Sequence, residues 1–340
     1  MELSTRNTTV YKNENSFVKR LKVFTWPVPG CYLYFLSQGD FDLYIPVNNG
    51  LKGYYGRGEM LPYGSNIFEV PAREVKNMHF DCILYQSSKD YLTDRYEILS
   101  DQQRNLPQIY LEHNPPTAHL ANTRHVVDDP EVMLVHVNHF NKLMWDNNNT
   151  PNCVIEPGVI GTNVSYTGAK KRGLVVIDNL SRQGRLAGLD VFLEVRKHVP
   201  LDLVGRGTQD LGLGEIPHSQ LAEFSSRYRF FFCPARYLSL NLCLIEAMLA
   251  GIPVVGLATT GLSTVIRNGT NGFIHNNLDY LIAKMKGLLE DHKLAFRLGK
   301  EGQRTAQEKF NIQRFTADWK KLFEQVVSRK KYSMDALKSS

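Results

Sequence analysis

The chain has 340 residues, of which 43% are hydrophobic and 22% are charged, a balance typical of a soluble globular protein with about two domains. Its apolar runs are far shorter than the roughly 20 residues that a membrane-spanning helix needs, and the polar N-terminus lacks a signal-peptide core. We therefore expect a cytoplasmic protein. The five scattered cysteines lack paired spacing, which predicts buried free thiols in preference to disulfides or a metal site.

The net charge of +6 is unevenly distributed along the chain. Residues 1–158 contain 14 Lys and Arg against 18 Asp and Glu, whereas the remainder contains 26 against 16. A basic second half favours an anionic ligand: a nucleoside diphosphate, a nucleic acid or an acidic membrane. Nucleic acid is the least favoured, because no aromatic residues are interleaved with the basic ones. A patch at Lys19, Arg20 and Lys22 leaves open a peripheral contact with the inner face of a membrane.

The first half alternates predicted strands with helical segments. Residues 1–20 are expected to form a flexible arm, and the first strand, LKVFTW, leads through Gly30 into a helix, CYLYFLSQ. A glycine at such a strand end lets a ligand approach the backbone, although a plain turn explains it equally well. Further strands are predicted at DLYIPV, NIFEVP, FDCILYQS, PQIYLEHN and VMLVHVN. This alternation predicts an α/β fold with a doubly wound parallel sheet.

One predicted strand, PQIYLEHN, ends in two polar residues, Glu112 and His113, just before a proline pair. Because ligands bind at the carboxyl ends of parallel strands, we expect His113 to contact a ligand; a structural hydrogen bond is the alternative. The pair Asp128 and Asp129 is followed by Pro130 and is interpreted as a turn, not as a metal site.

A change to Gly, Thr and Lys near residues 157–172 predicts a domain boundary. The expected domains are residues 21–160 and 161–327, followed by a basic tail at residues 328–340. The second domain opens with the strand GLVVID, a polar loop and the helix LDVFLEVRKHV. Arg182 and Arg185 lie in that loop, where guanidinium groups and a helix N-terminus suit a diphosphate; solvated loop charges are the alternative.

The stretch from Phe230 to Ile274 is the clearest strand, helix and strand unit in the chain. An apolar run precedes a helix that carries Glu246 and ends at Gly251. A second strand and a loop rich in Gly and Thr follow. This unit therefore predicts a ligand site at the strand ends.

The run EAMLAGIPVVGLATTGLSTVIRNGTNGFI, with VVIDNLS, LVGRGTQ and IPHSQLAEF before it, resembles the donor-binding region of family 4 retaining glycosyltransferases. The resemblance covers most of residues 173–327, and in the first half it depends on Gly30 and His113. It implies the GT-B fold, in which two Rossmann-like domains face each other across a cleft. It also implies metal-independent transfer of a sugar, with retention, from a nucleoside-diphosphate sugar to a glycan, lipid-linked or small acceptor, without a further cofactor.

The resemblance also implies roles for individual residues. His113, Arg185 and Glu246 form the expected catalytic set, with Glu246 binding the ribose hydroxyls and His113 close to the donor sugar. Beside Gly30 and Arg182, the expected donor-binding residues are Gly205, Gly207, Ile216, Ser239, Leu240, Asn241, Leu242, Cys243, Thr260 and Gly261. Among them, the backbone amides from Asn241 to Cys243 would face the diphosphate.

Two positions depart from the family pattern. Leu238 stands where the family usually has a second Glu that touches the donor sugar, and Ala187 stands where it usually has a Lys. Altered sugar recognition through Ser239 or Asn241, and replacement of the lysine by Arg182 or Arg185, are the expected consequences. The same departures keep two alternatives open: a non-catalytic nucleotide-binding protein and a nucleotide-sugar epimerase.

Overall fold

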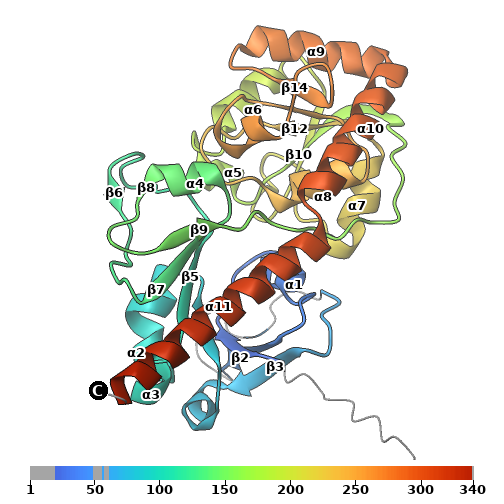
Figure 1. Ribbon diagram of the computed structural model, residues 1–340. Helices are drawn as coiled ribbons and strands as arrows, with labels where there is room; N and C mark the ends of the chain where they lie inside the picture. The colour runs from blue at the N-terminus through green and yellow to red at the C-terminus, as the bar shows by residue number, and fades with distance from the viewer. Residues whose placement is uncertain (1–19, 49–55, 57–60, 339–340) are drawn as a thin grey trace, which may run out of the picture.

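The structure, a computed structural model, describes residues 20–48, 56 and 61–338 and has two α/β lobes (Figure 1). Residues 1–19 of the arm predicted at residues 1–20, including Lys19 of the basic patch, lie outside the described residues, as does most of the glycine-rich interval after Val47. Each lobe is built on its own parallel sheet.

The first lobe contains a seven-stranded sheet in the order β3-β2-β1-β4-β5-β7-β9, in which every neighbouring pair is parallel. Its strands are β1 (Lys22–Thr25), β2 (Asp42–Val47), β3 (Ile67–Pro71), β4 (Cys82–Tyr85), β5 (Gln108–Glu112), β7 (Val132–His136) and β9 (Asn152–Val154). The helices of this lobe are α1 (Tyr32–Leu36), η1 (Ala72–Asn77), η2 (Asp90–Asp94), α2 (Arg95–Ile98), α3 (Asp101–Arg104) and α4 (His139–Met144). A small second sheet pairs β6 (Thr123–Arg124) with β8 (Trp145–Asp146).

The second lobe contains a five-stranded parallel sheet in the order β11-β10-β12-β13-β14. Its strands are β10 (Lys170–Val176), β11 (Leu201–Val204), β12 (Tyr228–Cys233), β13 (Val254–Gly256) and β14 (Gly272–Ile274). Its helices are α5 (Leu180–Gln183), α6 (Leu189–Arg196), α7 (His218–Ser226), α8 (Leu242–Leu249), η3 (Thr260–Thr264), α9 (Leu278–Glu290), α10 (His292–Lys309) and α11 (Ile312–Lys338).

The α/β fold class expected from the sequence is confirmed, for a simple physical reason. Strands covered by helices on both faces bury every side chain, so they appear in the sequence as short continuous apolar runs. In β12, for example, the first five residues are buried, and in β4 all four are. Between β4 and α3 the chain forms the π-helical turn η2 directly before α2, and α11 extends as far as Lys338, so that the expected basic tail begins as part of this helix.

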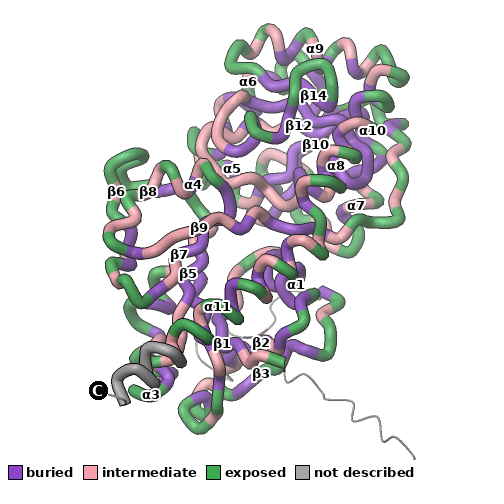
Figure 2. Tube along the Cα trace, viewed as in Figure 1, coloured by how far each residue is buried: buried purple, intermediate pink, exposed green. Residues whose placement is uncertain are grey.

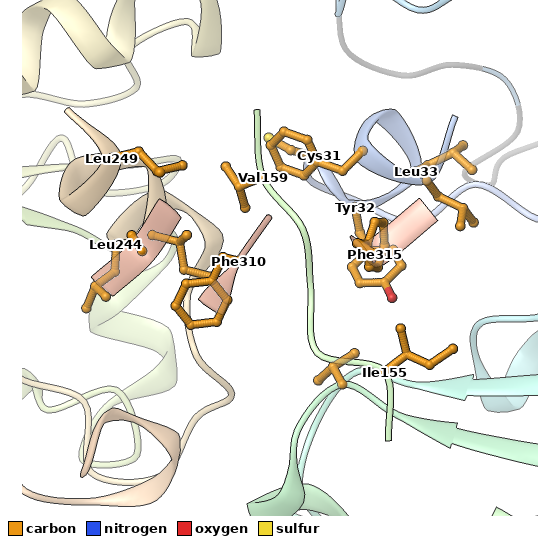
Figure 3. Close-up of a cluster of buried hydrophobic side chains, with 14 of the residues drawn as sticks. Cys31, Tyr32, Leu33, Ile155, Val159, Leu244, Leu249, Phe310 and Phe315 are labelled. Carbon is orange, nitrogen blue, oxygen red and sulfur yellow. The ribbon is translucent and has the colours of Figure 1, made fainter. Parts of the chain in front are cut away.

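The apolar core joins the two lobes, so that they are not separate globules. One cluster includes strand residues from both sheets, such as Leu43 and Leu174, while two further clusters lie on the outer faces of the sheets. Figure 2 shows buried residues along the strands of both lobes. Residues 155–169 form the linking segment between the last strand of the first lobe and the first strand of the second. In Figure 3, Phe310 lies beside Leu244 on one side of this segment, and Phe315 lies beside Tyr32 on the other. The cleft between the lobes therefore has an apolar base.

Helix α11 fixes the lobes to each other by running from the second lobe across the first (Figure 1). The indole Nε1 of Trp319 donates to the Tyr32 hydroxyl at 3.3 Å, and Lys320 pairs with Asp40 at 2.7 Å. The ring of Phe323 packs on that of Phe41, 5.0 Å between centroids. Neither α11 nor any other helix in the described part of the chain has the length and apolarity needed to cross a lipid bilayer.

Candidate functional site

Two neighbouring cavities lie between the lobes. The larger, of about 490 Å³, is bordered by the β1–α1 loop and the end of β5 on one side and by the start of α8 on the other. Its polar lining residues are Gln86, Ser87, His113, Asn114, Asn138, Glu156, Ser239 and Thr264. The smaller, of about 110 Å³, shares Gly30 and Cys31 with the larger and extends along the second sheet. The carboxyl ends of both sheets therefore face one elongated cleft.

The glycines of the expected site are distributed differently between these cavities. Gly30 lines both and has a φ of +95°, with open space where a side chain would begin. Gly205 lines the smaller cavity at a φ of +144°, and a Cβ there would come within 2.3 Å of the Ile177 carbonyl oxygen, so only glycine fits. Gly261 lines the larger cavity. Gly207 borders neither cavity.

The other expected donor-site residues also divide between the cavities. Ile216 and Cys243 line the smaller one, whereas Leu240 and Leu242 line the larger one. Thr260, in η3, lines neither, and its neighbour Thr264 takes part instead. The structure thus brings most of the predicted donor residues to the cleft.

Glu246 projects from α8 toward α7, where the histidine at the start of that helix meets it. The Nε2 atom of His218 lies 2.7 Å from Glu246 Oε1, and the two side chains are only 22% and 11% exposed. His218 lines the smaller cavity, while Glu246 lies just behind it in a recess shared with Cys243. One carboxylate oxygen of Glu246, the residue predicted to bind the ribose, is therefore already hydrogen-bonded to His218.

The N-terminus of α8 is capped by Asn241, the residue just before the helix. The Oδ1 atom of Asn241 accepts from the Cys243 amide at 2.9 Å, and its Nδ2 atom donates to the Val176 carbonyl at 3.0 Å. These two bonds occupy the Asn241 side chain and one of the amides expected to face a diphosphate. Asn241 therefore anchors the start of the helix to the end of β10.

Leu238, where the resembled family usually has a Glu, directly precedes a residue that spans the cleft. Leu238 packs against the apolar cluster on the outer face of the second sheet. The following residue, Ser239, reaches across the cleft: its hydroxyl donates to the His113 carbonyl and accepts from Asn141 Nδ2 at 2.7 Å. Asn141 also donates to the same carbonyl, and its Oδ1 atom is buried without a hydrogen-bond partner. This interlobe contact leaves Ser239 little hydrogen-bonding capacity for a sugar.

His113 itself is held in one tautomer. The Gln86 amide nitrogen donates to Thr25 Oγ1 and to the Trp26 carbonyl, so its Oε1 atom faces His113 Nε2 at 3.2 Å. The proton of the neutral imidazole must then lie on Nε2, which leaves Nδ1 as an acceptor. Burial lowers the His113 pKa to about 4, so the ring is neutral at pH 7.

Acid should destabilise the protein through His113 and His136, whose pKa values are both lowered in the folded chain. Burial lowers the pKa of His136, as of His113, to about 4 from an ordinary 6.5. Because the unfolded chain binds these protons first, the stabilisation is complete above pH 6.5 and is lost as the pH falls toward 4, by at most about 1.4 kcal/mol per pH unit for each histidine. Urea unfolding between pH 7.5 and 5 measures this slope. His136→Gln should make it shallower, whereas exposed His119 replaced by Gln should leave it unchanged.

The cations expected to clamp a diphosphate do not line either cavity. Arg185 is 76% exposed and pairs with Asp190 at 2.6 Å, and the same carboxylate also binds Arg236. Arg182 lies in the exposed helix α5. Instead Arg206, between Gly205 and Gly207, lines the smaller cavity and is held by Asp178 through Nε and Nη2 at 2.8 and 2.7 Å.

Several cleft residues were missed by sequence reasoning. Arg206 and His218 lie within LVGRGTQ and IPHSQLAEF, so a signal for them was present in segments already recognised as part of the site. Glu156 is the carboxylate that lines the larger cavity, at 3.1 Å from Lys309. Neither Glu156 nor Gln86 gave a signal, because each reaches the cleft only through the packing of the lobes.

The comparisons with known proteins agree with this architecture. Residues 185–321 match a family model described as "Glycosyl transferase-like". A curated relative, the D-inositol 3-phosphate glycosyltransferase 1 of Catenulispora acidiphila, is 35% identical over 72 residues, which are 19% of this chain and 17% of the relative. The match thus spans only about a sixth of that relative's length.

Solved structures share the fold over a longer range. The sucrose-phosphate synthase of Thermosynechococcus elongatus has a TM-score of 0.68 at 14% identity, covering 91% of this chain and all of the other. HepE of Anabaena in complex with UDP has a TM-score of 0.61 at 14% identity, covering 90% and 100%. TarM of S. aureus, in a complex with UDP, has a TM-score of 0.57 at 15% identity, covering 71% of this chain and 55% of its own.

The sheet orders, the interlobe cleft and these matches lead to one assignment. The chain has the GT-B fold of two facing α/β lobes, and its residues 185–321 are similar to the glycosyl transferase-like family.

Proposed function

We propose that this protein is a retaining, metal-independent glycosyltransferase that moves a sugar from a nucleoside-diphosphate sugar to a glycan, lipid-linked or small acceptor. The observation that carries the proposal is the position of Glu246 and the α8 N-terminus beside Gly205 and Ile216, along a cleft at the carboxyl ends of two parallel sheets. A carboxylate beside a glycine-lined strand end suits a ribose, and a helix N-terminus suits a diphosphate.

The three parts of the donor, its nucleoside, diphosphate and sugar, would each occupy a different part of the cleft. The smaller cavity, with Ile216 and Gly205, would take the nucleoside, and Arg206 would face the diphosphate. The sugar would occupy the larger cavity, where a hydroxyl can donate to the free Nδ1 of neutral His113. UDP is bound by the TarM and HepE relatives, which supports a uridine nucleotide as the first donor to test.

In the proposed reaction the bond between the anomeric carbon and the diphosphate oxygen breaks, and a bond from the acceptor oxygen to the same face of that carbon forms. The acceptor proton passes to the departing diphosphate, so the residues need not supply a general base. Their contribution is electrostatic: positive charge at Arg206 and the amides of α8 stabilise the diphosphate as its charge grows. The larger cavity supplies one carboxylate, Glu156, among the described residues, and it is already paired with Lys309.

Turnover of uridine and guanosine diphosphate sugars, followed by release of the free nucleotide, tests the proposal. We expect the Arg206→Gln variant to lose about 10–150-fold in kcat/KM, because a hydrogen bond to a charged group contributes about 1.5–3 kcal/mol. Arg185→Gln is the matched control on the same lobe, and it should change turnover far less, since Arg185 lines neither cavity and is 76% exposed. A larger loss for Arg185→Gln than for Arg206→Gln would contradict this assignment and favour Arg185, in the loop expected from the sequence, as the diphosphate ligand.

A second candidate function is nucleotide binding without transfer. It is favoured by the sugar end of the cleft, where Leu238 packs into the core and Ser239 is used by His113 and Asn141. A protein of this kind would bind a nucleoside diphosphate and its sugar conjugate about equally, because the sugar would add no contact. Equal affinities, together with no turnover over a broad panel of acceptors, would favour this second function over the first.

A further inference from the structure

Three side chains of different chemistry meet behind the smaller cavity. The thiol of Cys31, the imidazole of His218 and the carboxylate of Glu246 each offer one ligand atom, and all three atoms lie within 4.8 Å of one another. Cys31 is 7% exposed, and His218 and Glu246 are partly buried. The three come from separate elements: the loop before α1, the first turn of α7 and the middle of α8.

This set of ligand atoms matches a zinc site more closely than a site for calcium or magnesium. Zinc accepts thiolate, imidazole and carboxylate together, whereas calcium and magnesium select oxygen. Ligand atoms around a tetrahedral zinc lie roughly 3.2–3.8 Å apart, given bond lengths of about 2.0–2.3 Å. The present separations are 2.7 Å for His218 and Glu246 and no more than 4.8 Å for any pair of the trio, so small side-chain movements reach that geometry.

The site also has access from solvent and joins the lobes. Cys31 and His218 both line the smaller cavity, whose wall also carries Glu215 and the ion pair between Asp178 and Arg206. Cys31 belongs to the first lobe, and the other two ligands belong to the second. In Figure 3, Cys31 lies next to Val159 of the linking segment.

We propose that Cys31, His218 and Glu246 bind Zn²⁺, with water as a fourth ligand, and that the bound ion is a competitive inhibitor at the nucleotide site. Binding releases the thiol proton of Cys31 to solvent and moves the His218 proton from Nε2 to Nδ1, so that all three ligands carry the charge zinc requires. Zinc then binds the Glu246 carboxylate, which is predicted to hold the ribose, and links Cys31 of the first lobe to the two ligands of the second. Only the inhibitory consequence rests on the proposed function; binding does not.

Tight binding of one Zn²⁺ per chain is the first expected result, measured on the full chain in a thiol-free reducing buffer by competition with a chromophoric chelator. Cys31→Ser and His218→Gln should each weaken binding by about 100-fold or more, since even outer partners of metal ligands contribute 10–100-fold. Cys243→Ser is the matched control: its thiol lines the same cavity, one turn before Glu246, but is outside the trio.

Cobalt(II) supplies a readout that folding defects do not imitate. The wild-type protein and Cys243→Ser should show the near-ultraviolet absorption of a thiolate bound to Co²⁺, and Cys31→Ser should lack it while its circular dichroism stays native. No stoichiometric zinc binding by the wild type, or binding that depends on Cys243 and not on Cys31, would overturn the site.

Inhibition is tested separately, with each protein's metal-free rate of donor turnover as its own reference. Zinc should inhibit the wild type and spare Cys31→Ser at the same total concentration, because chelation of zinc by the nucleotide is equal in the two assays. Equal inhibition of both proteins would refute the inhibitory role. If no turnover exists at all, the proposed transferase function fails, while the zinc-binding result stands on its own.

Discussion

Replacing Glu246 by alanine should lower nucleotide affinity by about 10–150-fold for each ribose hydrogen bond to the carboxylate that is lost, because a bond to a charged group contributes about 1.5–3 kcal/mol. The carboxylate is only 11% exposed and is fixed by His218 at 2.7 Å, so its orientation is set before a ligand arrives. Calorimetric titration with a nucleoside diphosphate measures the effect, and turnover of the corresponding sugar donor should fall in parallel.

Glu223→Ala is a suitable control for that experiment. Glu223 lies on α7, the helix that also carries His218, but it is exposed and pairs with Arg227 on the same helix. Its removal should leave nucleotide affinity within the error of the titration. If Glu246→Ala binds nucleotide as tightly as the wild type while Glu223→Ala does too, the carboxylate is not a ribose ligand, and the site must be reassigned.

The second large effect concerns the attachment of α11 to the first lobe. Trp319 is fully buried, its indole donates to Tyr32, and its ring packs 5.3 Å from Phe323. Replacing a buried aromatic residue by alanine removes its burial and leaves a cavity, which destabilises a protein by about 3–5 kcal/mol. We therefore expect Trp319→Ala to lose that amount of unfolding free energy in urea titrations followed by circular dichroism.

A variant that keeps the ring distinguishes packing from the hydrogen bond. Trp319→Phe retains most of the buried apolar surface and should lose clearly less than the alanine variant. Phe296→Ala, at a ring that is 52% exposed on α10, should change stability by no more than about 0.5 kcal/mol. Equal losses for Trp319→Ala and Phe296→Ala would mean that α11 contributes no packing energy where it crosses the first lobe.

The sequence by itself determined the fold class and indicated the strand ends that border the candidate site. Strands buried on both faces, such as β12, are short apolar runs, and a strand, helix and strand order requires a parallel sheet. Both signals are local, so they do not depend on how the lobes meet. The placement of Glu246 on a helix directly after β12 follows from the same local pattern. The resemblance of the second half to glycosyltransferases has the same origin, and the family match covers residues 185–321.

Tertiary structure alone decided which side chains occupy the site. Arg185 had the right chemistry for a diphosphate, but Asp190 and Arg236 hold it at the surface, and Arg206 lines the cavity instead. The contact between Ser239 and His113 joins residues far apart in the chain, so no local pattern could reveal it. It exists only because the lobes meet at a shared apolar cluster, and side-chain hydrogen bonds at that junction depend on its packing.

The meeting of Cys31 with His218 and Glu246 has the same physical cause. In the sequence the cysteine is one of five without paired spacing, which predicts an inert buried thiol. Spacing detects a metal site only when its ligands lie on one or two neighbouring elements. Here the ligands come from both lobes, so the docking of one sheet's helices against the other's decides whether the three form a site.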